Sequence, residues 1–156
     1  MTEVIFPGPE GRLEGILHLN KDKESPIALV LAPDPQLGVT MRNRIVHQIH
    51  YLYKDLGFTV MRINYRGVGR SQGVFDNGVG ELSDAASALD YVQQIKPDSR
   101  FCWVAGYGFG AYVGMQLLMR RPEIVGFISI APPANKYDFT FLAPCPSSGL
   151  VINGTK

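Results

Sequence analysis

Five short apolar runs recur along the chain, and the segments between them carry apolar residues at helical spacing. Each run has four to eight residues, which is too short for a core helix and suits a buried strand of a parallel sheet. The runs are Ile27–Leu31, Phe58–Ile63, Phe101–Ala105, Ile124–Ala131 and Gly149–Ile152. Because strands and helices alternate, the sequence predicts an α/β fold with a mostly parallel sheet and helices on both faces.

Helices and an N-terminal hairpin complete the predicted architecture. The spacing of apolar residues predicts helices over Met41–Leu56, Glu81–Ile95 and Phe109–Arg120. Ahead of the first apolar run, a turn rich in proline and glycine separates two β-like segments, Glu3–Phe6 and Arg12–Leu19. We expect these two segments to form an antiparallel hairpin at one edge of the sheet.

The composition is that of an ordinary globular chain. Of the 156 residues, 46% are hydrophobic and 19% are charged, and the formal net charge is +1. This balance argues against disordered chains and nucleic-acid-binding arms, so we expect no nucleic-acid partner. The length predicts a single domain over residues 1–156. No apolar run approaches the roughly 18 residues of a membrane span, and we expect neither a membrane partner nor a signal peptide.

The two cysteines give no sign of a disulfide framework or a metal site. Cys102 and Cys145 lie far apart and match no C-x-x-C spacing. Cys102 falls within a predicted strand and suits a small core residue, whereas Cys145 lies between two prolines and is expected to be exposed. We therefore expect no metal, no cofactor and a reducing, cytoplasmic location.

The most informative local motif is the turn Gly106-Tyr107-Gly108-Phe109-Gly110, which joins a predicted strand directly to a predicted helix. That context is typical of a nucleophile elbow, G-x-S-x-G, in which small flanking residues let the helix pack close to the strand. Gly106 and Gly110 meet this need. The central residue is Gly108, however, so the hydroxyl that would attack an ester or amide carbonyl is absent.

A second segment, Gly69-Arg70-Ser71-Gln72-Gly73, fits the same spacing and does contain a serine. It lies beyond the end of its strand, and no helix is predicted to start at Gln72. A turn of this kind does not present its serine as an elbow does, so we expect Ser71 to be a loop serine.

Taken together, the motifs resemble the α/β-hydrolase superfamily, in particular its small bacterial members near dienelactone hydrolases and related esterases and peptidases. Besides the elbow, the resemblance rests on segments 32–41, 62–71, 81–85 and 131–133. It covers the N-terminal two-thirds of that family's fold. It implies a hydrolase-like protein related to enzymes that act on small esters or amides.

The sequence departs from that family's pattern in three places. Ala32 and Asp34 stand where related proteins commonly have histidines, and Gly108 replaces the nucleophilic serine. Family members also continue beyond the strand matching Gly149–Ile152, with loops that carry the catalytic aspartate and histidine, whereas this sequence ends at Lys156. The resemblance therefore implies a truncated pseudoenzyme, inactive or severely impaired.

The resemblance also assigns backbone groups to an oxyanion site. One donor is the N–H of Phe109, and the other comes from the first central loop, where Gln36 or Leu37 is expected because Pro33 and Pro35 have no N–H. The helix that starts at Phe109 directs its positive end at the same place. We expect an anion-friendly cleft and a small anionic or ester ligand.

Two alternatives remain open. The first is an active esterase or peptidase relative whose missing groups come from another chain or from Asp34, which either acts as base or nucleophile or fixes a turn. The second is a dinucleotide-binding domain, since Gly106-x-Gly108-x-x-Ala111 fits the loose fingerprint, although no acidic residue follows the next strand.

Basic residues are concentrated in segment 42–70, which contains Arg42, Arg44, Lys54, Arg62, Arg66 and Arg70. They form either a site for an acidic ligand or a solvated face.

The three histidines are His18, His47 and His50. They fall outside the late loop in which the catalytic histidine of a triad would lie, and we expect structural roles for them. If Gly149–Ile152 is the last strand, its open edge favours self-association.

Overall fold

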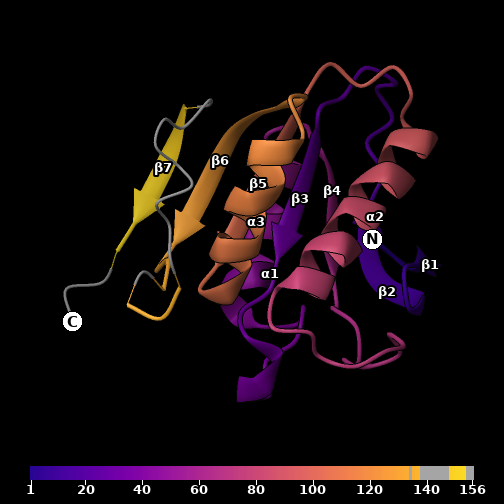
Figure 1. Ribbon diagram of the computed structural model, residues 1–156. Coiled ribbons are helices and arrows are strands. Elements are labelled where there is room, and N and C mark those ends of the chain that lie inside the picture. The colour runs from indigo at the N-terminus through magenta and orange to yellow at the C-terminus, as the bar shows by residue number, and fades with distance from the viewer. Residues whose placement is uncertain (134, 138–147, 154–156) are drawn as a thin grey trace.

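The computed structural model describes residues 1–133, 135–137 and 148–153, and in this part of the chain one sheet carries all the strands (Figure 1). The strands are β1 (Thr2–Gly8), β2 (Gly11–His18), β3 (Ile27–Leu31), β4 (Thr59–Ile63), β5 (Cys102–Tyr107), β6 (Ile124–Ile130) and β7 (Ser148–Ile152). The helices are α1 (Arg44–Asp55), α2 (Val79–Ile95) and α3 (Phe109–Arg120), with a short 3₁₀ turn, η1, at Pro35–Leu37.

The strand order is β1-β2-β4-β3-β5-β6-β7, and the sheet is mostly parallel. The antiparallel pairs are β1 with β2 and β2 with β4, while β4, β3, β5, β6 and β7 pair in parallel. This confirms the predicted α/β sheet with an antiparallel hairpin at one edge. The hairpin extends further than predicted, because β1 continues through Pro7, and an edge strand tolerates proline.

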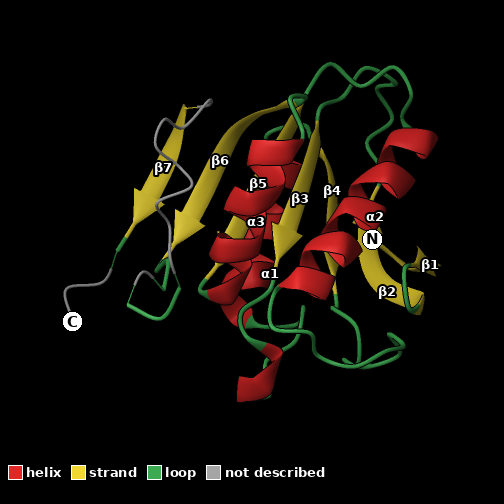
Figure 2. Cartoon of the chain, viewed as in Figure 1, coloured by secondary structure: helices red, strands yellow, loops and turns green. Residues whose placement is uncertain are grey.

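Helices cover both faces of the sheet, as predicted (Figures 1 and 2). Helices α2 and α3 pack against each other on one face, and α1 covers the other. Asn43 caps α1, accepting hydrogen bonds from the N–H groups of Ile45 and Val46. Helix α2 begins two residues before the predicted start, because the Glu81 carboxylate accepts the N–H of Gly78 at 2.8 Å and closes the first turn.

The core is centred on β3, whose five residues are all buried. Apolar side chains from α1, α2 and α3 join it from the two faces. Cys102 is part of this core, as predicted, and burial raises the pKa of its thiol. Cys145 lies outside the described residues.

Among the helices that the structure describes, none has both the length and the apolar character to cross a membrane.

Strand β7 differs from its prediction in burial. It pairs in parallel with β6 as expected, but all five of its residues are exposed, and the side chain of Leu150 retains 53% of its accessible surface. The three helices lie over β1 to β6 and leave β7 at the margin of the sheet (Figure 1). An apolar run predicts a strand, but its burial depends on what packs against it.

Candidate functional site at the glycine elbow

Strand β5 passes into helix α3 through Gly108 alone. This residue has φ 58° and ψ −120°, a backbone conformation that glycine adopts without strain. Its N–H donates to the carbonyl oxygen of Ile130 at 2.8 Å, which ties the turn to the end of β6. The local geometry is therefore the sharp strand-to-helix turn that the sequence predicts.

The two flanking glycines are required by close backbone contacts. A Cβ atom on Gly106 would overlap the carbonyl group of Gly110, and a Cβ on Gly110 would overlap the carbonyl of Leu31 in β3. At Gly108, in contrast, the nearest heavy atom to an added Cβ is the Cβ of Pro33, at 3.7 Å. The central position has room for a side chain, and the outer two have none.

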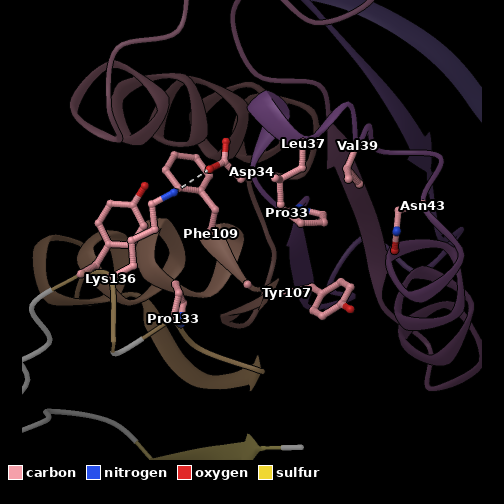
Figure 3. Close-up of a pocket in the computed structure, with 11 residues that line it drawn as sticks. Pro33, Asp34, Leu37, Val39, Asn43, Tyr107, Phe109, Pro133 and Lys136 are labelled. Atoms are coloured by element: carbon pink, nitrogen blue, oxygen red, sulfur yellow. Dashed lines mark hydrogen bonds and ion pairs between the residues drawn. The ribbon is translucent and has the colours of Figure 1, made fainter. Parts of the chain in front are cut away.

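A cavity of about 290 Å³ lies in front of Gly108 (Figure 3). It forms at the carboxyl ends of the central strands, where open α/β sheets bind ligands. Three segments contribute to it: the loop between β3 and α1, the elbow, and the loop after β6. Its lining residues are Pro33, Asp34, Leu37, Val39, Asn43, Tyr107, Gly108, Phe109, Pro133, Lys136 and Tyr137.

Asp34 lines the cavity and also caps η1. Its side chain is 8% exposed. Oδ1 accepts the N–H of Gln36 at 2.9 Å, and Oδ2 lies 3.4 Å from Nζ of Lys136. The N–H of Leu37 donates to the carbonyl oxygen of Asp34 at 3.0 Å. Both N–H groups expected as a second oxyanion donor are thus engaged inside the turn, and Gln36 does not line the cavity.

Phe109 is held firmly at the start of α3. Its ring is buried and packs against Tyr65, Phe75 and Tyr137, with centroid distances of 5.6 to 5.9 Å. Its N–H belongs to the first turn of the helix, where no intrahelical acceptor exists. No described residue accepts a hydrogen bond from it. The elbow therefore presents one fixed donor beside the cavity.

Sequence reasoning missed the contribution of Lys136 and Tyr137. Lys136 forms an ion pair with Asp34 across the cavity (Figure 3). The Tyr137 ring stacks on Tyr112 with a centroid distance of 4.3 Å. Burial raises the pKa of the Tyr137 hydroxyl. The only signal in the sequence is their place after a strand end, which indicates the correct edge of the sheet but not the direction of the side chains.

Ser71 is a structural residue, as expected. Its buried Oγ accepts the N–H of Glu14 at 3.0 Å and donates to the carbonyl oxygen of Asn64 at 2.9 Å.

Arg66, in the same loop, is also buried and has a structural role. Its backbone N–H and its guanidinium both donate to the Asp84 carboxylate. The hydrogen bond to Asp84 raises the pKa of the Arg66 guanidinium.

The three histidines lie outside the lining of the cavity at Gly108. His47 and His50 belong to α1 and His18 to β2, and none of them lines it. His50 is fully buried, and burial, together with the positive charge of Arg62, lowers the pKa of its imidazole to about 3. It is therefore neutral at physiological pH.

A mostly parallel sheet, a strand-to-helix elbow with crowded flanking glycines and a cavity at the carboxyl edge together define the α/β-hydrolase class. Comparison with known proteins agrees. The family model described as serine aminopeptidase, S33, matches residues 38–145, more than half of the chain. The chain belongs to this family of α/β hydrolases.

Two solved structures and one curated sequence are similar to this chain. A protein of unknown function from Agrobacterium tumefaciens superposes with a TM-score of 0.96 and 67% identity, covering 98% of this chain and 70% of that one. An α/β serine hydrolase homologue from Coxiella burnetii gives a TM-score of 0.89 and 33% identity, covering 98% and 73%. An uncharacterised protein of Rickettsia prowazekii (strain Madrid E) is 50% identical over 157 residues. That match covers 99% of this chain and 66% of the relative's length.

Proposed function

We propose that this protein is an α/β hydrolase that lacks serine-nucleophile catalysis and uses the cavity beside Gly108 to bind a small anionic or ester ligand. The observation that carries the proposal is Gly108 itself. The backbone has the elbow conformation, but no hydroxyl stands at its centre. Serine, threonine, cysteine and histidine are all absent from the described residues that line the cavity.

The ligand class follows from the groups that face the cavity. The free N–H of Phe109 and the start of α3 favour a carboxylate or carbonyl oxygen. Lys136 places an ammonium donor at the rim, where its charge is paired with the Asp34 carboxylate, and Asp34 also accepts the N–H of Gln36. Most of the remaining lining is apolar, from residues such as Leu37, Val39 and Pro133. A short carboxylic acid or its ester, with an apolar body, fits this distribution.

The alternative, an active hydrolase completed by Asp34, has one supporting observation. Asp34 lines the same cavity as Gly108. Its Oδ1 is bound to the N–H of Gln36, however, and a carboxylate used in this way is held as a turn cap rather than positioned for proton transfer. We therefore favour the binding function over an active hydrolase completed by Asp34, and the experiments below distinguish the two.

A fluorophosphonate probe tests the catalytic part of the proposal. Wild-type protein is expected to remain unlabelled, because Ser71 is buried and Gly108 has no side-chain hydroxyl. Gly108→Ser supplies a hydroxyl in open space. The matched control carries Ser71→Ala in addition to Gly108→Ser, so that labelling of Ser71 can be distinguished from labelling at position 108. Stoichiometric labelling of wild-type protein at a serine would contradict the proposal. We further expect Gly108→Ser to hydrolyse no p-nitrophenyl butyrate, because no histidine lines the cavity.

Ligand binding is measured separately from catalysis. Titration of ¹⁵N-labelled protein with butyrate is expected to shift the amide resonance of Phe109, because this N–H faces the cavity. Lys136→Gln should weaken that binding, and Lys54→Gln, on α1 outside the cavity lining, should leave it unchanged. An unmoved Phe109 resonance at saturating butyrate would count against the anion-binding cavity.

We also propose that the protein self-associates through β7. Its side chains are exposed, no strand of the described residues pairs with its outer edge, and open edges favour pairing with another strand. Sedimentation velocity at high concentration should reveal oligomers that Val151→Lys reduces. Val74→Lys, at an exposed apolar residue in a distant loop, is the control. A monodisperse wild-type monomer would refute this.

Two further proposals concern the chain as a whole. Residues 1–156 are proposed to form one domain, which the shared sheet supports, and a single cooperative unfolding transition is expected. A cytoplasmic location is proposed because the two cysteines show no disulfide pattern. Unfolding that is insensitive to reducing agent is the expected result.

A further inference from the structure

A second cavity, also of about 290 Å³, lies between α1 and the strands of the N-terminal half of the sheet. Its lining residues are Met1, Glu3, Ile16, Arg42, His47 and Arg62. It shares none of them with the cavity at Gly108. The basic segment 42–70 therefore does contribute to a concave site, although not through the strand-end arginines.

Arg62 is the unusual residue of this second cavity. It lies within β4, is 3% exposed, and donates from Nη1 to the carbonyl oxygen of Met41 at 2.9 Å. Its Nε is buried and has no hydrogen-bond partner, and no carboxylate among the described residues forms an ion pair with it. A buried cation without a counter-charge is strongly disfavoured, so an anion at this place would be stabilising.

Arg66 is a buried arginine of the same protein whose positive charge is compensated by a carboxylate. It is 5% exposed, much as Arg62 is, yet its guanidinium is matched by the Asp84 carboxylate and the carbonyl of Gly80. The two differ in their surroundings rather than in their burial. Burial and the positive charge of Arg42 both lower the pKa of the Arg62 guanidinium, whereas the pKa of Arg66 is raised.

A second arginine adds to the positive charge of the cavity lining. Arg42 and His47 line it from the loop before α1 and from α1 itself. Glu3 is the one carboxylate in the described lining, and it already pairs with Arg42 at 2.9 Å. The two arginines therefore leave one positive charge uncompensated.

We propose that this cavity is a binding site for a small oxyanion of the phosphate or phosphomonoester class, held by the Nε side of Arg62 and by Arg42. With Nη1 turned toward Met41, the Nε side of the guanidinium remains for a paired contact with two oxygens. Guanidinium groups suit phosphate oxygens in this way because their N–H donors form a planar fork. The site is independent of the elbow and needs no catalytic group.

Isothermal titration with inorganic phosphate tests the site, at constant ionic strength so that general screening is equal. Wild-type protein is expected to bind, and Arg62→Gln to weaken binding about tenfold or more, the effect of losing a charged hydrogen bond. Arg44→Gln removes an equal charge from α1 outside the cavity lining and should leave affinity unchanged. Equal binding by the Arg62→Gln and Arg44→Gln variants, or none by wild type, would overturn the proposal.

Further measurements make the result independent of folding defects and identify the ligand. Arg42 is exposed, so Arg42→Gln should fold normally and bind phosphate about threefold more weakly. Phosphate should raise the Tm of wild type and not that of Arg62→Gln. Tighter binding of glycerol phosphate than of inorganic phosphate would assign a phosphomonoester, and the reverse would assign the free ion. Binding of neither would overturn the proposal.

Discussion

Two turns of this protein share one glycine spacing and differ in almost everything else. The turn at 69–73 contains a serine, and its polar groups bond inward: Ser71 bonds to Glu14 and Asn64, and the N–H of Arg70 donates to the Glu14 carboxylate. The turn at 106–110 has no serine, but its central residue has positive φ, a helix follows it, and the space in front of it is open. Glycine spacing alone therefore does not create a nucleophile site. The elbow differs in leaving one N–H, that of Phe109, without an acceptor among the described residues and its central position open.

The largest effect is expected at the crowded flank of the elbow. Gly110→Ala should lower the free energy of unfolding by about 3 kcal/mol, because the new Cβ collides with the carbonyl of Leu31 and backbone atoms cannot move aside easily. Urea unfolding measures this. Gly114→Ala, where the nearest atom is a Val104 methyl at 3.1 Å, is the control. Equal losses for both variants would show that the close contact is not what requires glycine.

In the other turn, Ser71→Ala should lower the free energy of unfolding by about 2 kcal/mol, because the buried carbonyl of Asn64 and the partly buried N–H of Glu14 lose their partner. Ser83→Ala, on the exposed side of α2, should cost almost nothing. Both are read from urea denaturation. A Ser71→Ala variant of unchanged stability would remove the contrast between the two turns.

Gly108→Ala should cost only about 1 kcal/mol, the conformational penalty of a side chain at positive φ, since the space in front is open. Gly38→Ala is the control for positive φ alone, because Gly38 lies in the left-handed region at φ 76° and ψ 17° with no atom near the added Cβ. Thermal unfolding should give a loss at Gly108, where ψ is −120°, that is at least as large as the loss at Gly38. A much larger loss at Gly108 would mean that the elbow cannot accommodate a side chain.

The smallest effect is expected at the rim of the serine turn. The Gln72 amide oxygen accepts the N–H of Arg12 at 2.9 Å in an exposed position, so water can replace it. Gln72→Ala should therefore lower stability by about 0.5 kcal/mol. Should chemical denaturation show a loss as large as that of Ser71→Ala, the turn would be held from its rim and not from its buried serine.

Most of the fold could be predicted because it depends on local patterns. The apolar run Ile27–Leu31 matches β3, and Phe109–Arg120 matches α3. Apolar spacing predicts a start of α2 that is two residues late, because the first turn depends on the Glu81 side chain, which that spacing does not reveal. Exposure of β7 was missed because burial depends on neighbouring elements rather than on the strand itself.

The candidate site was predicted in outline only. Chain order places Asp34, Leu37, Gly108 and Phe109 at one edge of the sheet, and the structure brings them to one cavity. The engagement of Gln36 and Leu37 within η1 could not be foreseen, because it depends on the exact turn that Asp34 caps. The contrast between Arg62 and Arg66 was equally hidden, since both are arginines near one strand and only their tertiary partners differ.

The exposure of β7 has a consequence for the dynamics of the sheet. A strand that pairs with one described neighbour and buries none of its side chains can open without disturbing the core around β3. Its amide protons should exchange with deuterium through local opening, at rates far above those of β3, whose exchange requires global unfolding. The protein would thus show a gradient of protection across a single sheet, lowest at β7 and highest at its centre.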